Sequence, residues 1–324
     1  MRRLILRPGA IGDTIVSLPA LEHLCGNVEA EIWVPARNLP LVRHVAPARS
    51  FQEVQLDLLE IDPPPALVAR LCTFDEVVSW YGAAREEFRT ALAATGVTAK
   101  FFHALPPEGA GCHAVDFYLK QVGAWSEGQA AAVPWIPVQR RACGPPAGPS
   151  GVLCGAGAPA CRVDTRVNER AARRHIRSLT VAAQKPGGDP PSGYIAIHPF
   201  SGSPRKNWPL NDFGKVAARL AAAADRRVEW CAGADEALDG ARRFETLDGV
   251  AQWLAGAALY LGNDSGISHL AAACGTPSVV VFQASDSRVW APRGPCVTVL
   301  EQPQPEQAVT AGLELLRFGA SCRT

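Results

Sequence analysis

A polar segment with side chains that could bind a ligand, residues 262–277, lies between two apolar runs. Its Gly-Asn-Asp-Ser-Gly start is typical of a turn between a strand and a helix in a βαβ unit. Asp264 or Ser265 could cap the helix, Gly266 would let a ligand approach the backbone, and the helix dipole would favour an anion such as a diphosphate. His269 follows Ser265 by one helical turn, so both side chains can face one ligand. The alternative is a capped helix with a buried histidine.

A second such segment opens the chain. Residues 3–6 are apolar and strand-like, and a turn with Gly9 and Gly12 leads to Asp13 at the start of a helix. A carboxylate in this place could be a general base or only a helix cap. Arg7 and Gly12, beside the turn, are candidates for a contact with an acceptor or a phosphate.

The third segment, residues 198–209, reads His-Pro-Phe-Ser-Gly-Ser-Pro-Arg-Lys-Asn-Trp-Pro and follows an apolar run. Ligands of an open parallel sheet bind at the carboxyl ends of its strands. Lys206 and Asp264 follow strands of one predicted sheet and Asp13 follows a strand of another, so two facing sheets would bring them to one cleft. The alternative for Arg205 and Lys206 is a solvated pair on a loop.

Together, these three segments resemble glycosyltransferase family 9, the ADP-heptose:lipopolysaccharide heptosyltransferases. The resemblance runs from Arg3 to about Leu316 and implies an α/β protein with two Rossmann-like domains facing across a cleft, the GT-B fold. It also implies inverting, metal-independent transfer of heptose or a related sugar from a nucleotide-diphosphate donor, which in this family is ADP-linked. The implied acceptor is the lipopolysaccharide core or another envelope glycan.

The resemblance also implies roles for individual residues. Asp13 would take the proton of the acceptor hydroxyl, and Lys206, with the dipole of the helix after Gly266, would stabilise the leaving diphosphate. Ser201 and Ser203 would donate hydrogen bonds to phosphate oxygens. Trp208 is expected to pack beneath that loop.

The remaining donor contacts follow from the same resemblance. Glu236, after a predicted strand, would hold the ribose hydroxyls, although Asp235 is adjacent and leaves the register open. Asp264 would contact hydroxyls of the donor sugar, and Ser265 would offer its backbone to the diphosphate. His269 would lie near the diphosphate or orient Asp264.

The chain departs from the family pattern near Asp286, where Gln283 and Ala284 replace an expected glycine and proline. It has no paired-carboxylate Asp-x-Asp sequence, so we expect neither a metal ion nor another cofactor. Its ten cysteines are scattered without a Cys-x-x-Cys pair, which is typical of small buried hydrophobic residues.

Composition restricts the partners. The chain has 324 residues, 48% of them hydrophobic, and a net charge of +1, which gives no reason to expect a nucleic-acid partner. No apolar stretch reaches the roughly 20 residues that span a bilayer, and the start does not resemble a secretory signal. We therefore expect a cytoplasmic protein. The basic run 162–185 is either a solvated helix face or a contact with anionic lipid headgroups or a phosphorylated acceptor at the inner face of the cytoplasmic membrane.

Alternating strand and helix signals predict doubly wound parallel sheets. The expected domains are residues 1–160 on the acceptor side, a connecting helix and linker over 161–192, and a nucleotide-sugar domain over 193–324, with an irregular Gly/Pro-rich stretch at 143–159. Strands are predicted near 3–6, 29–34, 54–59, 76–80, 99–103, 194–198, 228–232, 257–261 and 278–282. Helices are predicted near 39–45, 64–72, 83–94, 113–122, 211–223, 247–255, 266–274 and 305–316, the last of them packing back across the domain interface.

Two other functions compete with glycosyl transfer. A nicotinamide-dependent oxidoreductase would use Rossmann units as well, but its Gly-x-Gly-x-x-Gly turn is absent. A non-catalytic nucleotide-sugar or glycan binding protein would not need Asp13, Lys206 and Asp264 together.

Overall fold

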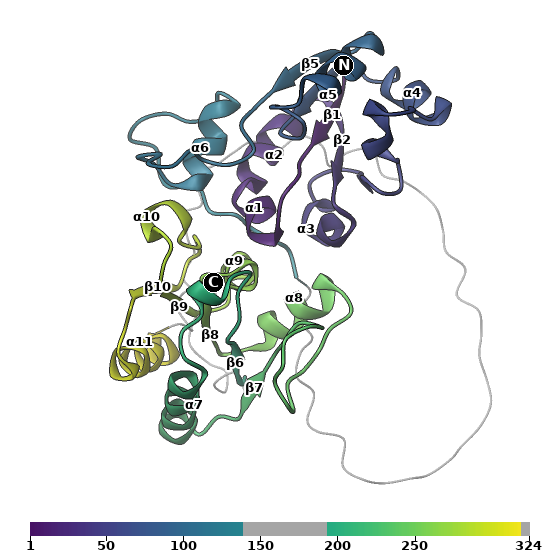
Figure 1. The fold of residues 1–324 in the computed structure, drawn as a ribbon. Coiled ribbons are helices and arrows are strands. Elements are labelled where there is room, and N and C mark those ends of the chain that lie inside the picture. The colour runs from purple at the N-terminus through teal and green to yellow at the C-terminus, as the bar shows by residue number, and fades with distance from the viewer. Residues whose placement is uncertain (139–192, 319–324) are drawn as a thin grey trace, which may run out of the picture. The chain divides into compact units, whose positions relative to one another are not determined.

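The computed structural model describes residues 1–138 and 193–318. They form two five-stranded sheets in which every pairing is parallel. Both sheets fall within one compact unit. The first contains β1 (Arg2–Leu6), β2 (Glu29–Val34), β3 (Ala48–Ser50), β4 (Glu76–Ser79) and β5 (Thr98–Phe101), and the second contains β6 (Ile195–His198), β7 (Val228–Trp230), β8 (Leu259–Asn263), β9 (Ser278–Phe282) and β10 (Val297–Glu301) (Figure 1).

The strand orders define where ligands can bind. The first sheet runs β3-β2-β1-β4-β5 and the second runs β10-β9-β8-β6-β7, so both are doubly wound α/β sheets. The order reverses beside β1 in the first sheet and between β6 and β8 in the second. Loops after strands diverge at such points and leave room for a ligand.

Helices make the crossovers between the parallel strands. The first half contains α1 (Ile11–Val16), α2 (Leu18–Cys25), η1 (Ala36–Asn38), α3 (Leu39–Val42), η2 (Leu56–Glu60), α4 (Pro65–Leu71), α5 (Glu86–Ala94) and α6 (Ala114–Gln121). The second half contains η3 (Pro204–Lys206), α7 (Leu210–Ala224), α8 (Leu247–Gly256), α9 (Gly266–Ala273), α10 (Ser287–Trp290) and α11 (Pro305–Phe318).

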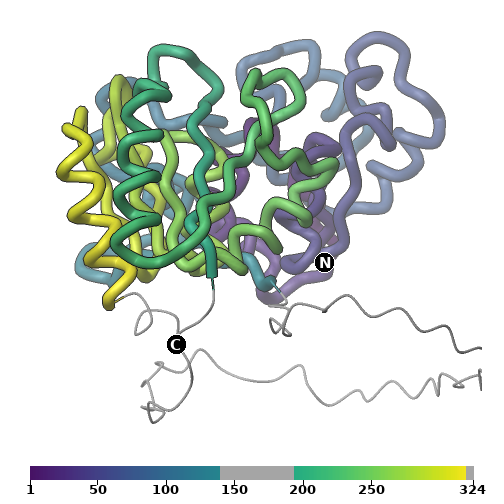
Figure 2. The backbone as a smooth tube through the Cα atoms, turned by 90° about the horizontal axis from the view of Figure 1, so that it is seen from below, coloured from purple at the N-terminus to yellow at the C-terminus, as the bar shows by residue number. Residues whose placement is uncertain are grey.

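The central strands of the second sheet are apolar because they lie in the core. β8 and β9 are buried along their whole length, as expected for strands covered on both faces. On one face, α7 and α11 lie side by side (Figure 2) and bury Leu220 and Ala308 against Leu259. Gly312 of α11 permits this approach, since a Cβ there would lie 3.0 Å from Leu220.

Most expected elements are present, but some expectations are wrong. Residues 54–59 form no strand: Gln55 has a positive φ of 57°, and η2 follows it with Leu56 and Leu59 buried three residues apart. The helix over 305–316 extends to Phe318 and packs on α7, β8, β9 and β10, rather than across to the first half as expected. The basic run 162–185, the stretch 143–159 and the boundary at 160 lie outside the described residues.

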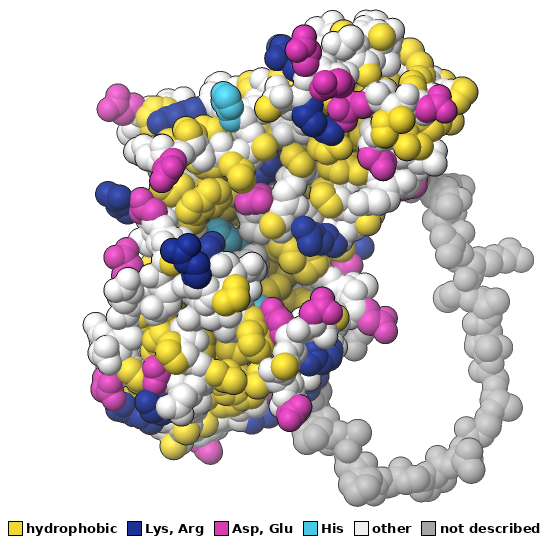
Figure 3. Space-filling model, viewed as in Figure 1, with side chains coloured by type: hydrophobic (Ala, Val, Ile, Leu, Met, Phe, Trp, Pro, Cys, Tyr) yellow, Lys and Arg dark blue, Asp and Glu magenta, His cyan; other side chains and the backbone are white. Residues whose placement is uncertain are grey.

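Three further features can be compared with the expectations from composition: the surface charge, membrane-spanning helices and the cysteines. Over the face seen in Figure 3, acidic and basic side chains are interspersed, in line with the small net charge. In the part of the chain that the structure describes, no helix has the length and apolar character needed to cross a membrane. Cys231 and Cys274 are buried as expected, whereas Cys72 is exposed.

Candidate active site

The turn after β1 presents the carboxylate of Asp13. Gly9 has a φ of +113°, and a Cβ there would lie 2.8 Å from Asp13 Oδ2, so only glycine fits this conformation and this space. The Ala10 N–H donates to Oδ2 at 2.8 Å. Asn38 is fully buried and donates to Gly9 O at 3.0 Å and to Thr14 Oγ1 at 2.8 Å. These two hydrogen bonds fix the turn against α1. Among the described residues, Oδ1 of Asp13 accepts no hydrogen bond.

Arg7 lies behind this turn instead of facing a ligand. Its side chain is fully buried, and its guanidinium donates to Ser17 Oγ at 2.8 Å, to Asp13 O at 2.5 Å and to Tyr118 Oη at 2.9 Å. The guanidinium also lies over the Tyr118 ring. This geometry does not support the expected contact of Arg7 with an acceptor or a phosphate, because its donors already hold α1.

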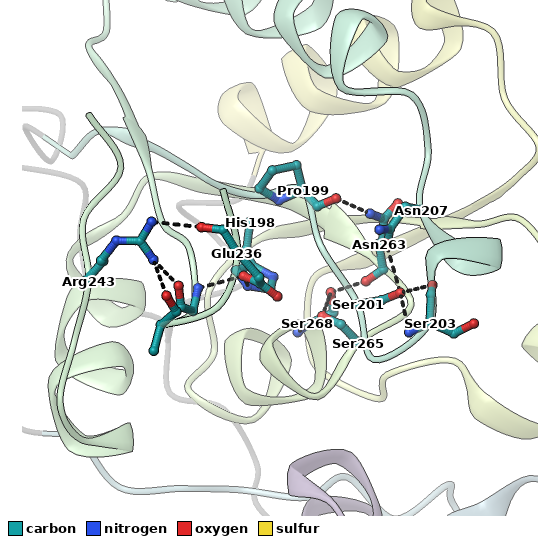
Figure 4. Close-up of polar contacts among 12 residues, drawn as sticks. His198, Pro199, Ser201, Ser203, Asn207, Glu236, Arg243, Asn263, Ser265 and Ser268 are labelled. Carbon is teal, nitrogen blue, oxygen red and sulfur yellow. Dashed lines mark hydrogen bonds and ion pairs between the residues drawn. The ribbon is translucent and has the colours of Figure 1, made fainter. Parts of the chain in front are cut away.

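The loop between β6 and α7 carries Lys206 and is fixed by one buried side chain. Asn263, at the end of β8, donates from Nδ2 to Pro199 O at 2.6 Å and accepts from Trp208 N at 2.9 Å (Figure 4). The two ends of the loop are thus tied to the neighbouring strand. Trp208 is buried against Phe213, with ring centroids 5.2 Å apart, which confirms that it packs beneath the loop.

Inside this loop, the two expected phosphate ligands differ in their surroundings. Ser201 Oγ lies 2.8 Å from Asn207 Oδ1 and 2.8 Å from Ser203 O, so its hydroxyl stabilises the turn. Ser203 and Lys206 line a pocket of about 390 Å³. The other residues of this pocket are Arg205, Ala284, Ser285, Asp286 and Trp290.

Lys206 and Asp264 form an ion pair at the edge of this pocket. Lys206 Nζ lies 2.8 Å from Asp264 Oδ2, and the Asp264 side chain is only 6% exposed. Ser285 Oγ donates to the same oxygen at 2.5 Å. The three residues come from the loops after β6, β8 and β9, so the strand reversal between β6 and β8 brings together what the sequence separates.

Helix α9 begins beside this pair. Ser265 caps it, with Oγ accepting from Ser268 N at 3.4 Å. A Cβ at Gly266 would lie 2.7 Å from the Cβ of Ile11, so this glycine lets α1 approach α9. Gly12 has the matching role, since a Cβ there would lie 3.1 Å from the His269 ring. Both glycines thus serve helix packing in addition to any ligand contact.

His269 lies on α9 among the charged candidates. Burial lowers the pKa of its imidazole to about 4, and the charges that act on it include those of Asp264, Asp13 and Lys206. The ring is therefore neutral at pH 7. A neutral histidine can donate one hydrogen bond and accept another, which fits an orienting role better than a charge on a phosphate.

Glu236 follows β7 and turns toward His198 at the end of β6 (Figure 4). His198 Nε2 lies 3.2 Å from Glu236 Oε2, and the Gly233 N–H donates to the same oxygen at 2.6 Å. Asp235 is exposed. Of the two acids, Glu236 is the one held against the sheet.

Sequence patterns brought out Lys206, Asp264 and Glu236 but missed the side chains that hold them. Asn263 and His198 belong to segments that we singled out, yet neither was given a role. Nothing in the sequence points to Arg243, which donates to Glu236 O at 2.7 Å. In the part of the chain that the structure describes, no three His, Cys, Asp or Glu side chains gather as metal ligands would.

Comparison with known proteins identifies the family. Residues 165–313 match the model of glycosyltransferase family 9 (heptosyltransferase). This part of the chain belongs to glycosyltransferase family 9. The match confirms the resemblance drawn from the three motifs, two of which it contains, and it makes the chain a glycosyltransferase that uses a nucleotide-sugar donor. No curated protein sequence matches the chain.

Solved structures extend the likeness to the whole chain. E. coli ADP-heptose lipopolysaccharide heptosyltransferase II has a TM-score of 0.62 at 15% identity, with 98% of this chain and 99% of that chain covered. A family 9 glycosyltransferase from Veillonella parvula has a TM-score of 0.62 at 14% identity, with 98% and 97% covered. E. coli heptosyltransferase WaaC with ADP has a TM-score of 0.56 at 16% identity, with 99% and 100% covered. These likenesses establish the fold, which is GT-B.

Proposed function

We propose that the chain transfers heptose or a related sugar from an ADP-linked donor to an acceptor hydroxyl, with inversion at the anomeric carbon and without a metal ion. The observation that carries this proposal is the convergence of Lys206 and Ser285 on Asp264, beside the start of α9. A cation and a helix N-terminus together form a site for a diphosphate. Two solved relatives are described as bound to ADP or to an ADP-linked heptose analogue, which supports the choice of nucleotide.

The reaction needs a single displacement. The acceptor oxygen attacks the anomeric carbon while its proton passes to Oδ1 of Asp13, which accepts no hydrogen bond in the described part of the chain. The bond from the anomeric carbon to the diphosphate oxygen breaks, and ADP leaves with the electron pair. Lys206 and the N-terminus of α9 stabilise the charge that develops on the diphosphate.

The ion pair suggests how the donor enters. Without donor, Lys206 neutralises Asp264, since a nearly buried carboxylate needs a partner. With donor bound, Lys206 would turn to the diphosphate and Asp264 would accept hydrogen bonds from the hydroxyls of the sugar. Ser285 would hold Asp264 during the exchange.

The name of one structural relative, an ADP-heptose lipopolysaccharide heptosyltransferase, favours lipopolysaccharide as the acceptor. We propose that the acceptor is the lipopolysaccharide core or another envelope glycan, presented at the inner face of the cytoplasmic membrane. The turn after β1 with Asp13 would face this acceptor.

The test is a transfer assay with ADP-heptose and a lipopolysaccharide-core acceptor, in which released ADP and the mass of the product are measured. Asp13→Asn removes the base at constant volume and should lower turnover by about 10²–10⁴-fold. Its affinity for ADP should remain within about twofold, and Asp62→Asn, an exposed acid in a turn, serves as the matched control. Equal losses of turnover and ADP affinity would contradict the role of Asp13. Binding of nucleotide sugars without any transfer would identify a binding protein instead.

A further inference from the structure

The contact between His198 and Glu236 joins the two strands that border the predicted nucleotide site. His198 ends β6 with its side chain 7% exposed, and Glu236 lies in the turn after β7. His198 Nε2 is 3.2 Å from Glu236 Oε2, as Figure 4 shows. The family resemblance implies that Glu236 holds the ribose hydroxyls of the donor, but it implies no role for His198.

The two oxygens of Glu236 are in different situations. Oε2 accepts from both His198 and the Gly233 N–H. Oε1 accepts no hydrogen bond in the part of the chain that the structure describes, while the side chain is 27% exposed. One oxygen is therefore anchored to the protein, and the other is open to a ligand.

Arg243 fixes the turn from its other side. Its guanidinium donates to Gly233 O and, at 2.7 Å, to Glu236 O (Figure 4). The backbone of the turn is thus held by Arg243, and Oε2 of the carboxylate is held by His198 together with the Gly233 N–H. Since the contacts of Arg243 are separate, loss of the imidazole would leave Oε2 with one anchor instead of two without dissolving the turn.

The protonation states agree with this arrangement. Burial alone would raise the pKa of the Glu236 carboxyl, but the hydrogen bonds from His198 and Gly233, with the charge of Arg243, hold it below its ordinary value. An ionised carboxylate only accepts, so His198 must donate from Nε2. Nδ1 of His198 is buried and has no hydrogen-bond partner among the described residues, so the imidazole is held through its contact with Glu236.

We propose that His198 is a positioning residue that anchors Oε2 of Glu236 and so aims Oε1 at the 2′- and 3′-hydroxyls of the ribose of the donor nucleotide. The proposal rests on the proposed function, because it takes the donor to be ADP-linked, with Glu236 as the ligand of its ribose. A carboxylate anchored by the Gly233 N–H alone would rotate more easily and would lose part of its hydrogen bonds to the diol, since ordering the side chain on binding costs conformational entropy.

The experiment compares ADP with 2′,3′-dideoxy-ADP by calorimetry in the full chain. The ratio of the two dissociation constants isolates the contribution of the diol. In the wild-type protein this ratio should be about tenfold or more, as for hydrogen bonds to a charged group. In His198→Phe and in the shorter, polar His198→Asn it should fall to about threefold or less, while the affinity for dideoxy-ADP stays unchanged.

Three matched variants complete the design. His198→Gln retains a donor that can reach Oε2 and should restore most of the ratio. In a Glu236→Gln background, His198→Phe should cause no further loss, because the two residues act as one unit. His23→Phe, an exposed histidine on α2, should leave the ratio unchanged.

The possible failures are distinguishable. A wild-type ratio that persists in both His198→Phe and His198→Asn would overturn the positioning role, as would a wild-type protein that does not distinguish the two nucleotides. A wild-type protein that binds neither nucleotide would contradict the proposed function itself. Thermal unfolding of each variant, measured without ligand, separates a loss of fold from a loss of the ratio.

Discussion

Lys206 Nζ and Asp264 Oδ2 lie 2.8 Å apart, although 58 positions separate them in the chain. The pair forms because β6 and β8 are neighbours in the sheet, so the loops that follow them meet. A diphosphate that binds Lys206 must therefore compete with Asp264 for the ammonium group.

This competition predicts an unusual effect of Asp264→Asn. Removal of the carboxylate removes both the competitor for Lys206 and a charge that repels the diphosphate, so ADP should bind several-fold more tightly. Transfer should nevertheless fall, because the sugar loses its acceptor of hydrogen bonds. Calorimetry with ADP and the transfer assay give the two values. Asp212→Asn is the control, since Asp212 pairs at 2.7 Å with the exposed Lys215 of α7. Weaker ADP binding in Asp264→Asn would contradict the competition.

A second prediction concerns the metal. Because Lys206 and the start of α9 are proposed to stabilise the leaving diphosphate, transfer should persist at an undiminished rate after EDTA treatment and in metal-free buffer. The assay is the same release of ADP, with and without added Mg²⁺ or Mn²⁺. Strict dependence on either ion would refute this part of the mechanism.

The lowered pKa of the buried His269 should make the stability of the protein depend on pH. Its pKa is about 4 in the folded protein and about 6.5 in the unfolded chain. The unfolded chain therefore takes up a proton first, and the free energy of unfolding should fall as the pH decreases from 6.5 toward 4. Urea unfolding at pH 7, 6 and 5 should give a shallower decrease for His269→Gln than for the wild-type protein.

Two other histidines also contribute to the pH dependence of stability. The pKa values of His44 and His113 are also lowered, chiefly by burial, so His269→Gln should reduce the pH dependence without abolishing it. The exposed His23→Gln provides the control. Parallel pH profiles for His269→Gln and the wild-type protein would show that His269 is not buried as described.

Replacement of Asn263 should lower the free energy of unfolding. Its two hydrogen bonds satisfy Pro199 O and Trp208 N, and Asn263→Ala leaves both backbone groups without this partner. At about 1–3 kcal/mol for each unsatisfied buried group, the free energy of unfolding should fall by about 2–6 kcal/mol. Denaturant titration measures it, with exposed Asn211→Ala as control; a loss below about 1 kcal/mol would exclude the anchoring role.

The sequence sufficed for the features that local patterns encode. Apolar runs predicted β1, β8 and β9, and Lys206 and Asp264, which were expected to follow strands of one sheet, lie in contact. The strand predicted over residues 54–59 is absent. The alternation of apolar and polar residues there resembles a strand, but the positive φ of Gln55 is incompatible with extended backbone. The three-residue β3 is too short to leave a pattern.

The contacts that hold the site were beyond such reasoning. Arg243 meets Glu236, and Ser285 meets Asp264, only because the loops after different strands converge in the folded sheet. Similarly, Arg7 follows β1 as an acceptor ligand would, and only the surrounding Tyr118 and Ser17 reveal that it is buried.

Lys206 is proposed to bind the diphosphate of the nucleotide. Calorimetry with ADP on Lys206→Ala, and on Lys215→Ala as the control lysine of α7, measures this contact at two salt concentrations. Lys206→Ala should weaken binding by about 1.5–3 kcal/mol, this loss should shrink as salt rises, and Lys215→Ala should leave the affinity unchanged. Equal affinities of Lys206→Ala and the wild-type protein for ADP would contradict it.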